Sequence, residues 1–385
     1  MTDSIEQIAT DRRSTSGTRW IALAPFILGL MIAIAGLEYV RTHVLFKLEE
    51  AALGTQTQMI YDGGPNGRTL CQDPRDEPLC HESYVKAGQP PAILWLGNSQ
   101  LPAINRPQTG DANAPALLHS ELAKRGSYLV SFAQPNANLA EHALVFASLM
   151  QRYKPKVLIL PVFLDDIRER GIRPYIADFA ANPDARSSIE ASPAWPYLAP
   201  LLTGGGDFQQ VEAHGGDTLQ RRVEAYVNGK LSDWWPLWRQ RAQIRGIALI
   251  ASHTARNRML GINAQTKRRV DQSLYNEKMG ILRATLDLAR KNGVRVLLYI
   301  PPYRTDVPGP YVEADYTRLK QDLAALAQEF GNTFANLEDV VPGPEWGMVV
   351  DGIFGFEDYD FMHFTGDGHK RLASRLAAEL NGMGF

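Results

Sequence analysis

Five short apolar runs, separated by segments with helical spacing, constrain the fold of this chain more than any other feature. The runs have the length of strands and cover residues 92–96, 128–132, 157–163, 294–300 and 333–337. The helical segments cover residues 116–124, 139–152, 281–291, 316–330 and 365–380. Strands that alternate with helices form parallel sheets covered on both faces. The pattern therefore predicts an α/β fold, with a parallel sheet of about five strands flanked by helices.

The alternation stops between residues 176 and 272. This stretch has no convincing buried strand, but it has helical patterns and four of the seven tryptophans. Trp234, Trp235 and Trp238 lie within about one turn of each other, beside three arginines. Tryptophan with arginine is typical of a membrane interface or a protein contact, and packing of a helical lobe onto the sheet explains these residues equally well. We predict a mostly helical insertion and leave its role open.

Residues 20–40 form the only segment of the sequence that is long and apolar enough to cross a bilayer. They are apolar for 18 residues before Glu38, and about 20 helical residues span the roughly 30 Å hydrocarbon core. Trp20 and Tyr39 stand at the two ends, as interface anchors do. Residues 33–35 also fit the cleavage site of a signal peptide, but the run is longer than the usual ~7–15-residue signal core. We therefore expect an uncleaved transmembrane anchor.

The anchor divides the chain into four expected parts. We assign residues 1–19 to a cytoplasmic tail, 20–40 to the anchor, 41–90 to an extracytoplasmic linker and 91–385 to the α/β domain with its insertion. A cleaved signal peptide would put the main domain on the same side of the membrane. The lipid bilayer is therefore an expected partner of residues 20–40, with the main domain outside the cytoplasm.

The linker contains both cysteines of the chain, Cys71 and Cys80. Two cysteines are too few for a disulfide framework or a four-thiolate zinc site. An oxidising compartment favours a bond between them over two free thiols, and closing so short a loop stabilises the fold by roughly 2–3 kcal/mol on the chain-entropy model. His81 follows without a standard metal-ligand spacing. We predict a disulfide, no metal and no cofactor.

The charge balance excludes one class of function. The chain has 40 Lys and Arg against 42 Asp and Glu, a formal net charge of −2. A dedicated nucleic-acid binder normally carries a basic excess or stripe. We therefore expect no nucleic-acid partner.

The turn after the first apolar run contains Gly97, Asn98 and Ser99. It lies at the carboxyl edge of the predicted sheet, where open α/β sheets place their sites. A serine in such a turn presents its hydroxyl and its own backbone N–H to a substrate carbonyl. Serines at strand ends are common, so this turn alone is weak evidence for catalysis.

A second polar segment, with Asp360 and His363, precedes the last predicted helix. A nucleophilic serine needs a base within hydrogen-bond reach, and the base needs an orienting carboxylate. An aspartate three residues before a histidine, in a loop ahead of a helix, supplies both groups. His369 is the competing base, but it is expected to lie inside the helix and face away. The joint occurrence of Ser99 and this segment is much more specific than either alone.

At these positions the sequence resembles the SGNH (GDSL-type) hydrolase superfamily. The resemblance rests on LGNSQ at 96–100, on DFMH at 360–363 and on the five-strand rhythm between them, and it covers roughly residues 90–175 and 290–382. It implies a three-layer α/β fold with a triad in the chain order serine, aspartate, histidine. By position, Ser99 becomes the nucleophile, His363 the base and Asp360 the third member.

The same resemblance implies oxyanion donors that this chain replaces. The family usually has a glycine after the second strand and an asparagine after the third. Here residues 134–138 read QPNAN, so a backbone N–H near Asn136 or the amide of Asn138 is expected to serve, with Asn98 as a further candidate. Asp165 stands where the asparagine is expected, and an ionised aspartate cannot donate a hydrogen bond. Losing one donor lowers kcat about 10²–10³-fold, so we expect a specialised enzyme that is slow with water.

The anchor, the extracytoplasmic domain and the altered third segment are similar to a membrane-attached subgroup. It includes the D-alanyl transfer proteins of the teichoic acid pathway and the SGNH partners of polysaccharide O-acetylation. Such proteins work with a multi-spanning membrane-bound O-acyltransferase. The likeness implies that Ser99 accepts or transfers an acyl group, that an envelope glycan hydroxyl receives it, and that the chain sits in a bacterial inner membrane facing the periplasm.

Four further residues follow predicted strands and are candidates for substrate contacts. Arg168 and Arg173 follow the third strand, where they suit an anionic substrate group, although a solvated helix start explains them as well. Tyr303 and Arg304 follow the fourth strand at the same carboxyl edge. We predict that these four residues line the site.

Three functions from different classes fit the sequence. The leading one is a membrane-anchored serine acyltransferase or esterase that acts on O-acyl groups of an envelope polysaccharide. The second is a lipid or lysophospholipid esterase, which a membrane-immersed tryptophan stripe would favour. The third is a non-catalytic assembly subunit, which the missing asparagine of the third segment suggests.

Overall fold

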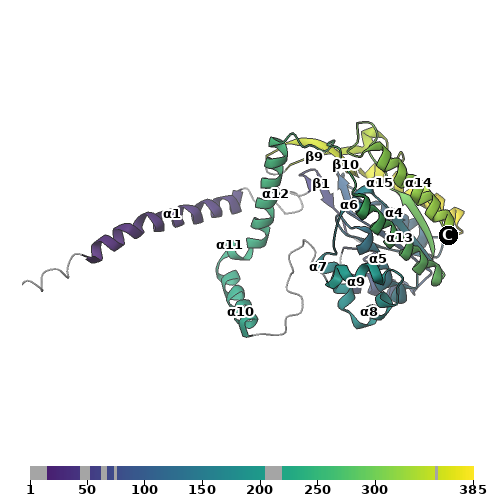
Figure 1. The fold of residues 1–385 in the computed structure, drawn as a ribbon, viewed down its shortest axis with the longest axis horizontal. Helices are drawn as coiled ribbons and strands as arrows, with labels where there is room; N and C mark the ends of the chain where they lie inside the picture. Colours follow the sequence, from purple (N-terminus) through teal and green to yellow (C-terminus); the bar gives the residue numbers. More distant parts are fainter. Residues whose placement is uncertain (1–14, 44–52, 62–66, 73–75, 204–218, 352–353) are drawn as a thin grey trace, which may run out of the picture. The chain divides into compact units, whose positions relative to one another are not determined.

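A six-stranded parallel sheet forms the centre of the computed structural model, which describes residues 15–43, 53–61, 67–72, 76–203, 219–351 and 354–385 (Figure 1). The strand order is β2-β5-β3-β6-β7-β8. The five predicted strands are all present, and the short β2 is an additional edge strand. The bounds are β2 (Leu70–Cys71), β3 (Ala92–Gly97), β5 (Tyr128–Ala133), β6 (Val157–Pro161), β7 (Arg295–Ile300) and β8 (Thr333–Asn336).

Helices cover both faces of the sheet. Successive residues of a strand point to opposite faces, so Leu94 and Leu96 of β3 join one buried cluster while Ile93 and Trp95 join the other. The first cluster also contains residues of α5, α13 and α14, and the second contains residues of α4 and α15. The predicted three-layer α/β architecture is confirmed. The helix bounds are α4 (Ala114–Ala123), α5 (Leu139–Tyr153), α13 (Gln272–Lys291), α14 (Glu313–Glu329) and α15 (Gly366–Gly382).

Two small antiparallel pairs, which the sequence did not indicate, stand beside the main sheet. Strand β1 (Thr57–Met59) pairs with β4 (Ala103–Asn105), and β9 (Trp346–Val350) pairs with β10 (Glu357–Phe364). The register of the second pair shifts between Tyr359 and Phe364. The expectation that residues 360–363 form a loop is therefore wrong, because they lie at the irregular end of a strand. A 3-10 helix, η2 (Gly343–Glu345), precedes β9.

The described residues between 176 and 272 are helical or irregular. The helices are α7 (Pro174–Ala181), α8 (Pro183–Glu190), α9 (Trp195–Thr203), α10 (Leu219–Trp234), α11 (Pro236–Arg239) and α12 (Arg241–Met259). The chain forms two compact units, of which one contains residues 1–51 and 216–253 and the other contains residues 52–215 and 254–385. Helices α7, α8 and α9 pack against α5 in the second unit.

The N-terminal helix α1 runs from Thr15 to His43. Within the ranges that the structure describes, no helix combines the length and the apolar character needed to cross a bilayer. Most of the expected tail, residues 1–14, and residues 44–52, 62–66 and 73–75 of the expected linker lie outside the described residues. In the described part of the linker, Cys71 and Cys80 form a disulfide between β2 and α3 (Glu77–Lys86).

Candidate active site

Ser99 stands at the point where the order of the strands reverses. From β3 the chain passes to β5 on one side and then to β6 on the other. Open α/β sheets bind ligands at the carboxyl ends of strands that diverge in this way. The turn after β3 is closed by hydrogen bonds from the backbone N–H of Leu101 to the Asn98 carbonyl and from the N–H of Ala103 to the Ser99 carbonyl. The fold thus fixes the serine at the edge where the sequence placed it.

Asn98 shapes this turn through its side chain. Its Oδ1 accepts a hydrogen bond from the backbone N–H of Gln100 at 2.9 Å, which is the local pairing that asparagine makes in turns. The residue is buried. The side-chain oxygen of Asn98 therefore helps to hold the turn that contains Ser99.

Ser99, His363 and Asp360 form a continuous chain of hydrogen bonds. His363 Nε2 lies 3.0 Å from Ser99 Oγ, and His363 Nδ1 lies 3.0 Å from Asp360 Oδ2. A carboxylate can only accept, so Nδ1 carries the proton and Nε2 is free to accept the serine hydroxyl proton. All three side chains are buried. The arrangement is that of a nucleophile, a base and an orienting carboxylate.

The carboxylate of Asp360 is held ionised by its surroundings. Burial alone would raise the pKa of Asp360. The nearby His363 and the hydrogen bonds that the carboxylate accepts together hold this pKa below its ordinary value. Its Oδ1 accepts from the backbone N–H groups of Met362 and His363, both at 2.9 Å. These bonds lie in the segment where the register of β10 shifts, between Tyr359 and Phe364.

Two residues that the sequence reasoning missed support this constellation. Asn105, at the end of β4, donates from Nδ2 to Asp360 Oδ2 at 3.2 Å. Gln100 donates from Nε2 to the Met362 carbonyl at 2.9 Å and to the Pro302 carbonyl at 3.1 Å. Gln100 thereby joins the turn that contains Ser99 to the segment that contains His363. Gln100 lies within LGNSQ, but its partners are more than 200 residues away, so no local sequence signal indicated its role.

His369, the competing base, lies inside α15 and away from the serine. Its Nδ1 accepts from the backbone N–H of Ala114, and its Nε2 donates to the Ala103 carbonyl, both at 3.0 Å. Burial lowers its pKa to about 4. The ring is therefore a neutral structural group that joins α15 to α4 and β4.

The loop after β5, residues 134–138, lies next to the turn that contains Ser99. The backbone N–H of Gln134 donates to the Gly97 carbonyl at 3.0 Å. Asn136 has a φ of 54°, in the left-handed region that asparagine tolerates better than most residues. This conformation accounts for an asparagine at this position of the loop.

The side chain of Arg173 binds the backbone of this loop. Its guanidinium donates to the carbonyls of Pro135 and Asn136 and pairs with the buried carboxylate of Glu141. Glu141 also accepts the backbone N–H of Asn138 at 3.1 Å. The structure does not support the prediction that Arg173 binds an anionic substrate group, because the carboxylate of Glu141 already balances the charge of Arg173.

Asn138 caps helix α5, and its side-chain oxygen and nitrogen both have hydrogen-bond partners. Its Oδ1 accepts from the backbone N–H groups of Ala140 and Glu141, and its Nδ2 donates to the Gly171 carbonyl at 3.1 Å. Lys278 donates to the same Oδ1 at 3.3 Å. The expectation that the Asn138 amide serves as an oxyanion donor therefore gives way to a capping role.

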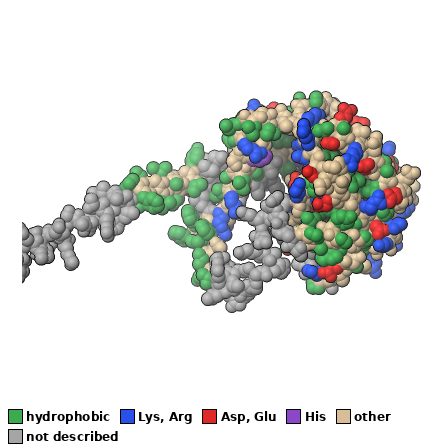
Figure 2. Space-filling model, viewed as in Figure 1, with side chains coloured by type: hydrophobic (Ala, Val, Ile, Leu, Met, Phe, Trp, Pro, Cys, Tyr) green, Lys and Arg blue, Asp and Glu red, His purple; other side chains and the backbone are tan. Residues whose placement is uncertain are grey.

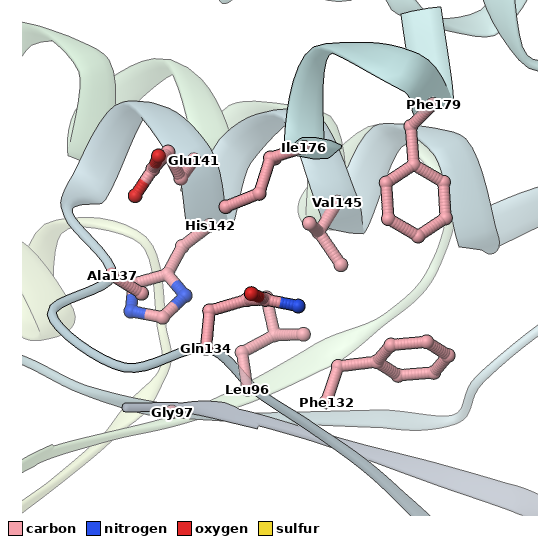
Figure 3. Close-up of a pocket in the computed structure, with 10 residues that line it drawn as sticks. All are labelled: Leu96, Gly97, Phe132, Gln134, Ala137, Glu141, His142, Val145, Ile176 and Phe179. Carbon is pink, nitrogen blue, oxygen red and sulfur yellow. The ribbon is translucent and has the colours of Figure 1, made fainter. Parts of the chain in front are cut away.

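A small cavity of about 10 Å³ lies behind this loop (Figure 3). The side chains of Gln134 and His142 point into it, and within the described residues neither Gln134 Oε1 nor His142 Nε2 has a hydrogen-bond partner. Burial, with the charge of Arg173 nearby, lowers the pKa of His142 to about 3. A cavity of this size matches one water molecule. His142 is therefore a neutral, buried residue.

A larger cavity of about 180 Å³ opens against His363 and Asp360. Asp165 lines it and accepts hydrogen bonds from Arg268 at 2.6 Å and from the Tyr311 hydroxyl at 3.0 Å. Asp165 is thus an acceptor with its charge balanced, as its chemistry required. Asp166, the next residue, is buried, and burial raises its pKa well above the ordinary value.

The remaining predicted contact residues have structural partners. Arg168 donates to Asp165 at 2.9 Å and is partly exposed. Tyr303 is buried and stacks on Phe361, with ring centroids 5.7 Å apart. Arg304 is also buried and donates to Asp306 at 2.9 Å and to the Gly347 carbonyl at 2.7 Å. Tyr303 and Arg304 therefore support strands β9 and β10 behind the triad.

Comparison with solved structures finds lipases, acylhydrolases and esterases. A GDSL-like lipase from Bacteroides thetaiotaomicron aligns at 10% identity with a TM-score of 0.35, over 79% of this chain and 98% of that chain. A lipase/acylhydrolase from Enterococcus faecalis aligns at 11% identity and 0.36, over 76% and 96%. A catalytic mutant of an acetylxylan esterase from Geobacillus stearothermophilus aligns at 10% and 0.36, over 75% and 93%. No protein-family model matches the sequence, and no curated protein matches it either.

Proposed function

We propose that this chain is a serine-dependent acyl-ester enzyme of the SGNH type that transfers or hydrolyses O-acyl groups of a cell-envelope polysaccharide. The observation that carries the proposal is the hydrogen-bonded chain from Ser99 through His363 to Asp360 at the strand-order switch point. Its three residue types, order and distances match the requirements of nucleophilic acyl transfer.

The first half of the reaction forms an acyl-enzyme. Ser99 Oγ attacks the ester carbonyl, and its proton passes to His363 Nε2. The resulting imidazolium is stabilised by the ionised carboxylate of Asp360. The tetrahedral intermediate then collapses, the bond to the leaving alcohol breaks, and His363 returns the proton to that oxygen. Ser99 is left carrying the acyl group as an ester.

The second half releases the acyl group to an acceptor. His363 takes a proton from a glycan hydroxyl or from water, whose oxygen attacks the acyl-enzyme carbonyl. Collapse of the second intermediate breaks the bond to Ser99 Oγ, which recovers its proton from His363. A glycan hydroxyl gives a new ester, whereas water gives a free acid. The two acceptors distinguish a transferase from an esterase.

The backbone N–H groups of Ser99 and Asn136 are our proposed oxyanion donors. Both belong to turns at the carboxyl ends of neighbouring strands, and the N–H of Gln134 joins these turns by donating to Gly97. Preorganised donors of this kind contribute about 10²–10³-fold each to kcat. Arg173 supports the second donor because it holds the carbonyls of Pro135 and Asn136.

A cavity of about 180 Å³ lies against His363 and Asp360, and Ser99 is not among the residues that line it. Our expectation of a short acyl group therefore rests on the proposed polysaccharide O-acyl reaction, and esters of different chain length test it against the lipid esterase reaction.

The proposal includes membrane attachment through residues 20–40, with the main domain in the periplasm of a bacterial cell and a membrane-bound O-acyltransferase as partner. It rests on the apolar sequence of these residues. Phe26 and Ile32 of α1 are exposed apolar side chains, which suits a helix that faces lipid.

A panel of aryl esters with acyl chains from acetyl to dodecanoyl tests the function. We expect turnover by the purified chain that is greatest for the shortest acyl groups and is lost in Ser99→Ala. Ser120→Ala, which changes an exposed serine on α4, serves as the matched control and should retain full activity. Preference for long chains would favour the lipid esterase. No turnover and no acyl-enzyme, even with the membrane partner, would favour a non-catalytic subunit.

A further inference from the structure

Helix α10 carries an exposed stripe of apolar and aromatic side chains. Val223, Tyr226, Val227 and Trp234 are all exposed, and Trp234 reaches 82%. Their spacing of three, four and seven residues puts them on one face of the helix. We call these four residues the α10 stripe. Soluble monomers seldom leave such a face uncovered unless it has a partner.

The neighbouring tryptophans show that this exposure is selective. Trp235 and Trp238 stack on each other with ring centroids 6.5 Å apart. Trp238 donates from Nε1 to Asn228 at 3.2 Å, and Arg241 lies over its ring at 4.9 Å. These contacts join α11 to α10 and to the start of α12. Two of the three clustered tryptophans therefore stabilise the fold, while Trp234 remains exposed.

Basic residues flank the stripe. Residues 219–253 contain six Lys and Arg against two Asp and Glu, although the whole chain has a net charge of −2. Lys230 lies within the apolar face, with its Nζ 5.8 Å from the centre of the Tyr226 ring. Arg239 and Arg245 are exposed nearby. Figure 2 shows hydrophobic and basic side chains side by side along these helices.

We propose that the α10 stripe and its flanking basic residues lie in the headgroup layer of an anionic lipid bilayer. Aromatic and aliphatic side chains on one face, with lysine and arginine at its border, are the composition of helices that lie in a membrane interface. The cationic excess complements anionic headgroups, and each basic residue near such a surface strengthens binding about fivefold.

Attachment through residues 20–40 makes this second contact effective. Helix α1 contacts α11 within the same compact unit. A membrane anchor on α1 would therefore hold α11 and the adjoining α10 close to the lipid surface, at a high effective concentration. The inference rests on the proposed membrane attachment and is independent of the chemistry of Ser99.

Fluorescent labelling of the full chain in vesicles tests the inference. The native cysteines are paired, so Tyr226→Cys and Trp234→Cys each introduce one reactive thiol for an environment-sensitive dye. Ser232→Cys, on the opposite face of α10, is the matched control. Each labelled chain is reconstituted into phosphatidylcholine vesicles with or without phosphatidylglycerol, and lipids with a headgroup-level nitroxide serve as the quencher.

We expect strong quenching at positions 226 and 234 and weak quenching at 232, with phosphatidylglycerol required for the full difference. Lys230→Glu should reduce the ratio of lipid-bound to unbound α10 stripe by at least fivefold. Lys124→Glu, the same charge change on an exposed lysine at the end of α4, should leave it unchanged.

Four results would overturn the inference. Equal quenching at all three positions in chains that float with the vesicles would refute the interfacial contact while leaving the anchor intact. Quenching that is the same in neutral and anionic vesicles would refute the role of the basic residues. Quenching that needs a co-reconstituted O-acyltransferase would show a protein partner. A chain that fails to float at high salt would refute the anchor as well.

Discussion

Asn105 donates a hydrogen bond from Nδ2 to Oδ2 of Asp360 over a distance of 3.2 Å. The two residues lie on different strands and are 255 positions apart in the sequence. The same nitrogen lies 3.0 Å from the Met348 carbonyl of β9. Asn105 can approach so closely because Gly347 has no side chain, since a Cβ there would lie 1.9 Å from the Asn105 amide carbon. The oxygen of Asp360 that faces His363 is therefore fixed from both sides.

We predict that Asn105→Ala lowers kcat more than it changes KM. The substitution removes the donor that orients Asp360, so the base is less well aligned and less stabilised when it is charged. We expect a fall in kcat of about 10–100-fold, by analogy with supporting residues of other sites, and a loss of about 1–3 kcal/mol in the free energy of unfolding. Steady-state kinetics on a short-chain ester and urea unfolding measure the two effects.

Asn113→Ala is the matched control for this substitution. Asn113 is also buried, and it caps α4 by accepting the backbone N–H of Ala116 at 3.0 Å. Its loss should destabilise the fold by about 1 kcal/mol with kcat unchanged in the folded enzyme. Equal kinetic effects of the two substitutions would show that Asn105 acts only through stability.

Arg173 and Arg168 should respond very differently to substitution. Arg173→Met leaves the buried carboxylate of Glu141 without its partner, which typically costs about 3–5 kcal/mol of stability. It also releases the carbonyls of Pro135 and Asn136, so kcat should fall. Arg168→Met removes a partly exposed pair with Asp165 and should cost about 0–1 kcal/mol.

The double variant Arg173→Met/Glu141→Gln separates charge from position. Removing both charges should restore part of the stability lost in Arg173→Met, because no buried carboxylate is left unpaired. The low kcat should remain, since the loop carbonyls still lack their donor. Wild-type kcat in either variant would contradict the role of Arg173 in positioning the loop.

Asn136 offers a test of which group stabilises the oxyanion. Asn136→Gly keeps the backbone N–H and accepts a φ of 54° without strain, so activity should be retained. Asn136→Val forces a β-branched residue into the left-handed region and should reduce both stability and kcat. Kinetic assays of the two variants decide the question. A large fall in kcat for Asn136→Gly would identify the side-chain amide as the donor instead.

Stability should fall as the pH drops below about 6.5, because two histidines are buried in the neutral form. The pKa of His142 is about 3 and that of His369 is about 4 in the folded chain, against about 6.5 for an unperturbed histidine. The unfolded chain therefore binds protons that the folded chain does not. Each histidine should lower the free energy of unfolding by about 1.4 kcal/mol per pH unit between pH 6.5 and about pH 4.

Comparison with His142→Gln isolates one of these contributions. Other groups act with their own signs, such as Asp166, whose raised pKa makes it contribute less stability as the pH rises. These contributions are nearly equal in the two proteins and cancel in the difference. Urea unfolding from pH 7 to pH 4.5 should show the gap between wild type and variant closing as the pH falls. A constant gap would mean that His142 becomes protonated in the folded state.

The sequence was sufficient for five of the six strands of the main sheet and for the three residues that meet at the candidate site. Apolar runs of strand length identified β3, β5, β6, β7 and β8, because a buried parallel strand needs an unbroken apolar sequence. The aspartate-to-histidine spacing indicated Asp360 and His363, because their chemistry is local and three residues suffice to join them.

Long-range contacts were beyond the reach of sequence patterns. Asn105 and Gln100 act through partners more than 200 residues away, and nothing in their local sequence marks them. Arg173 was assigned to a substrate because an arginine after a strand suits an anion. Its pairing with Glu141 depends on how the segment before α7 packs against α5, which periodicity does not reveal.

The most direct test of the central claim is covalent labelling of the serine. Intact chain is treated with a fluorophosphonate, and the modified residue is located by peptide mass spectrometry. Our account predicts one adduct on Ser99 of the wild type, which is absent from Ser99→Ala and strongly reduced in His363→Ala, with both variants folded. Labelling of another serine, or equal labelling of Ser99 in His363→Ala, would contradict an activated nucleophile at this site.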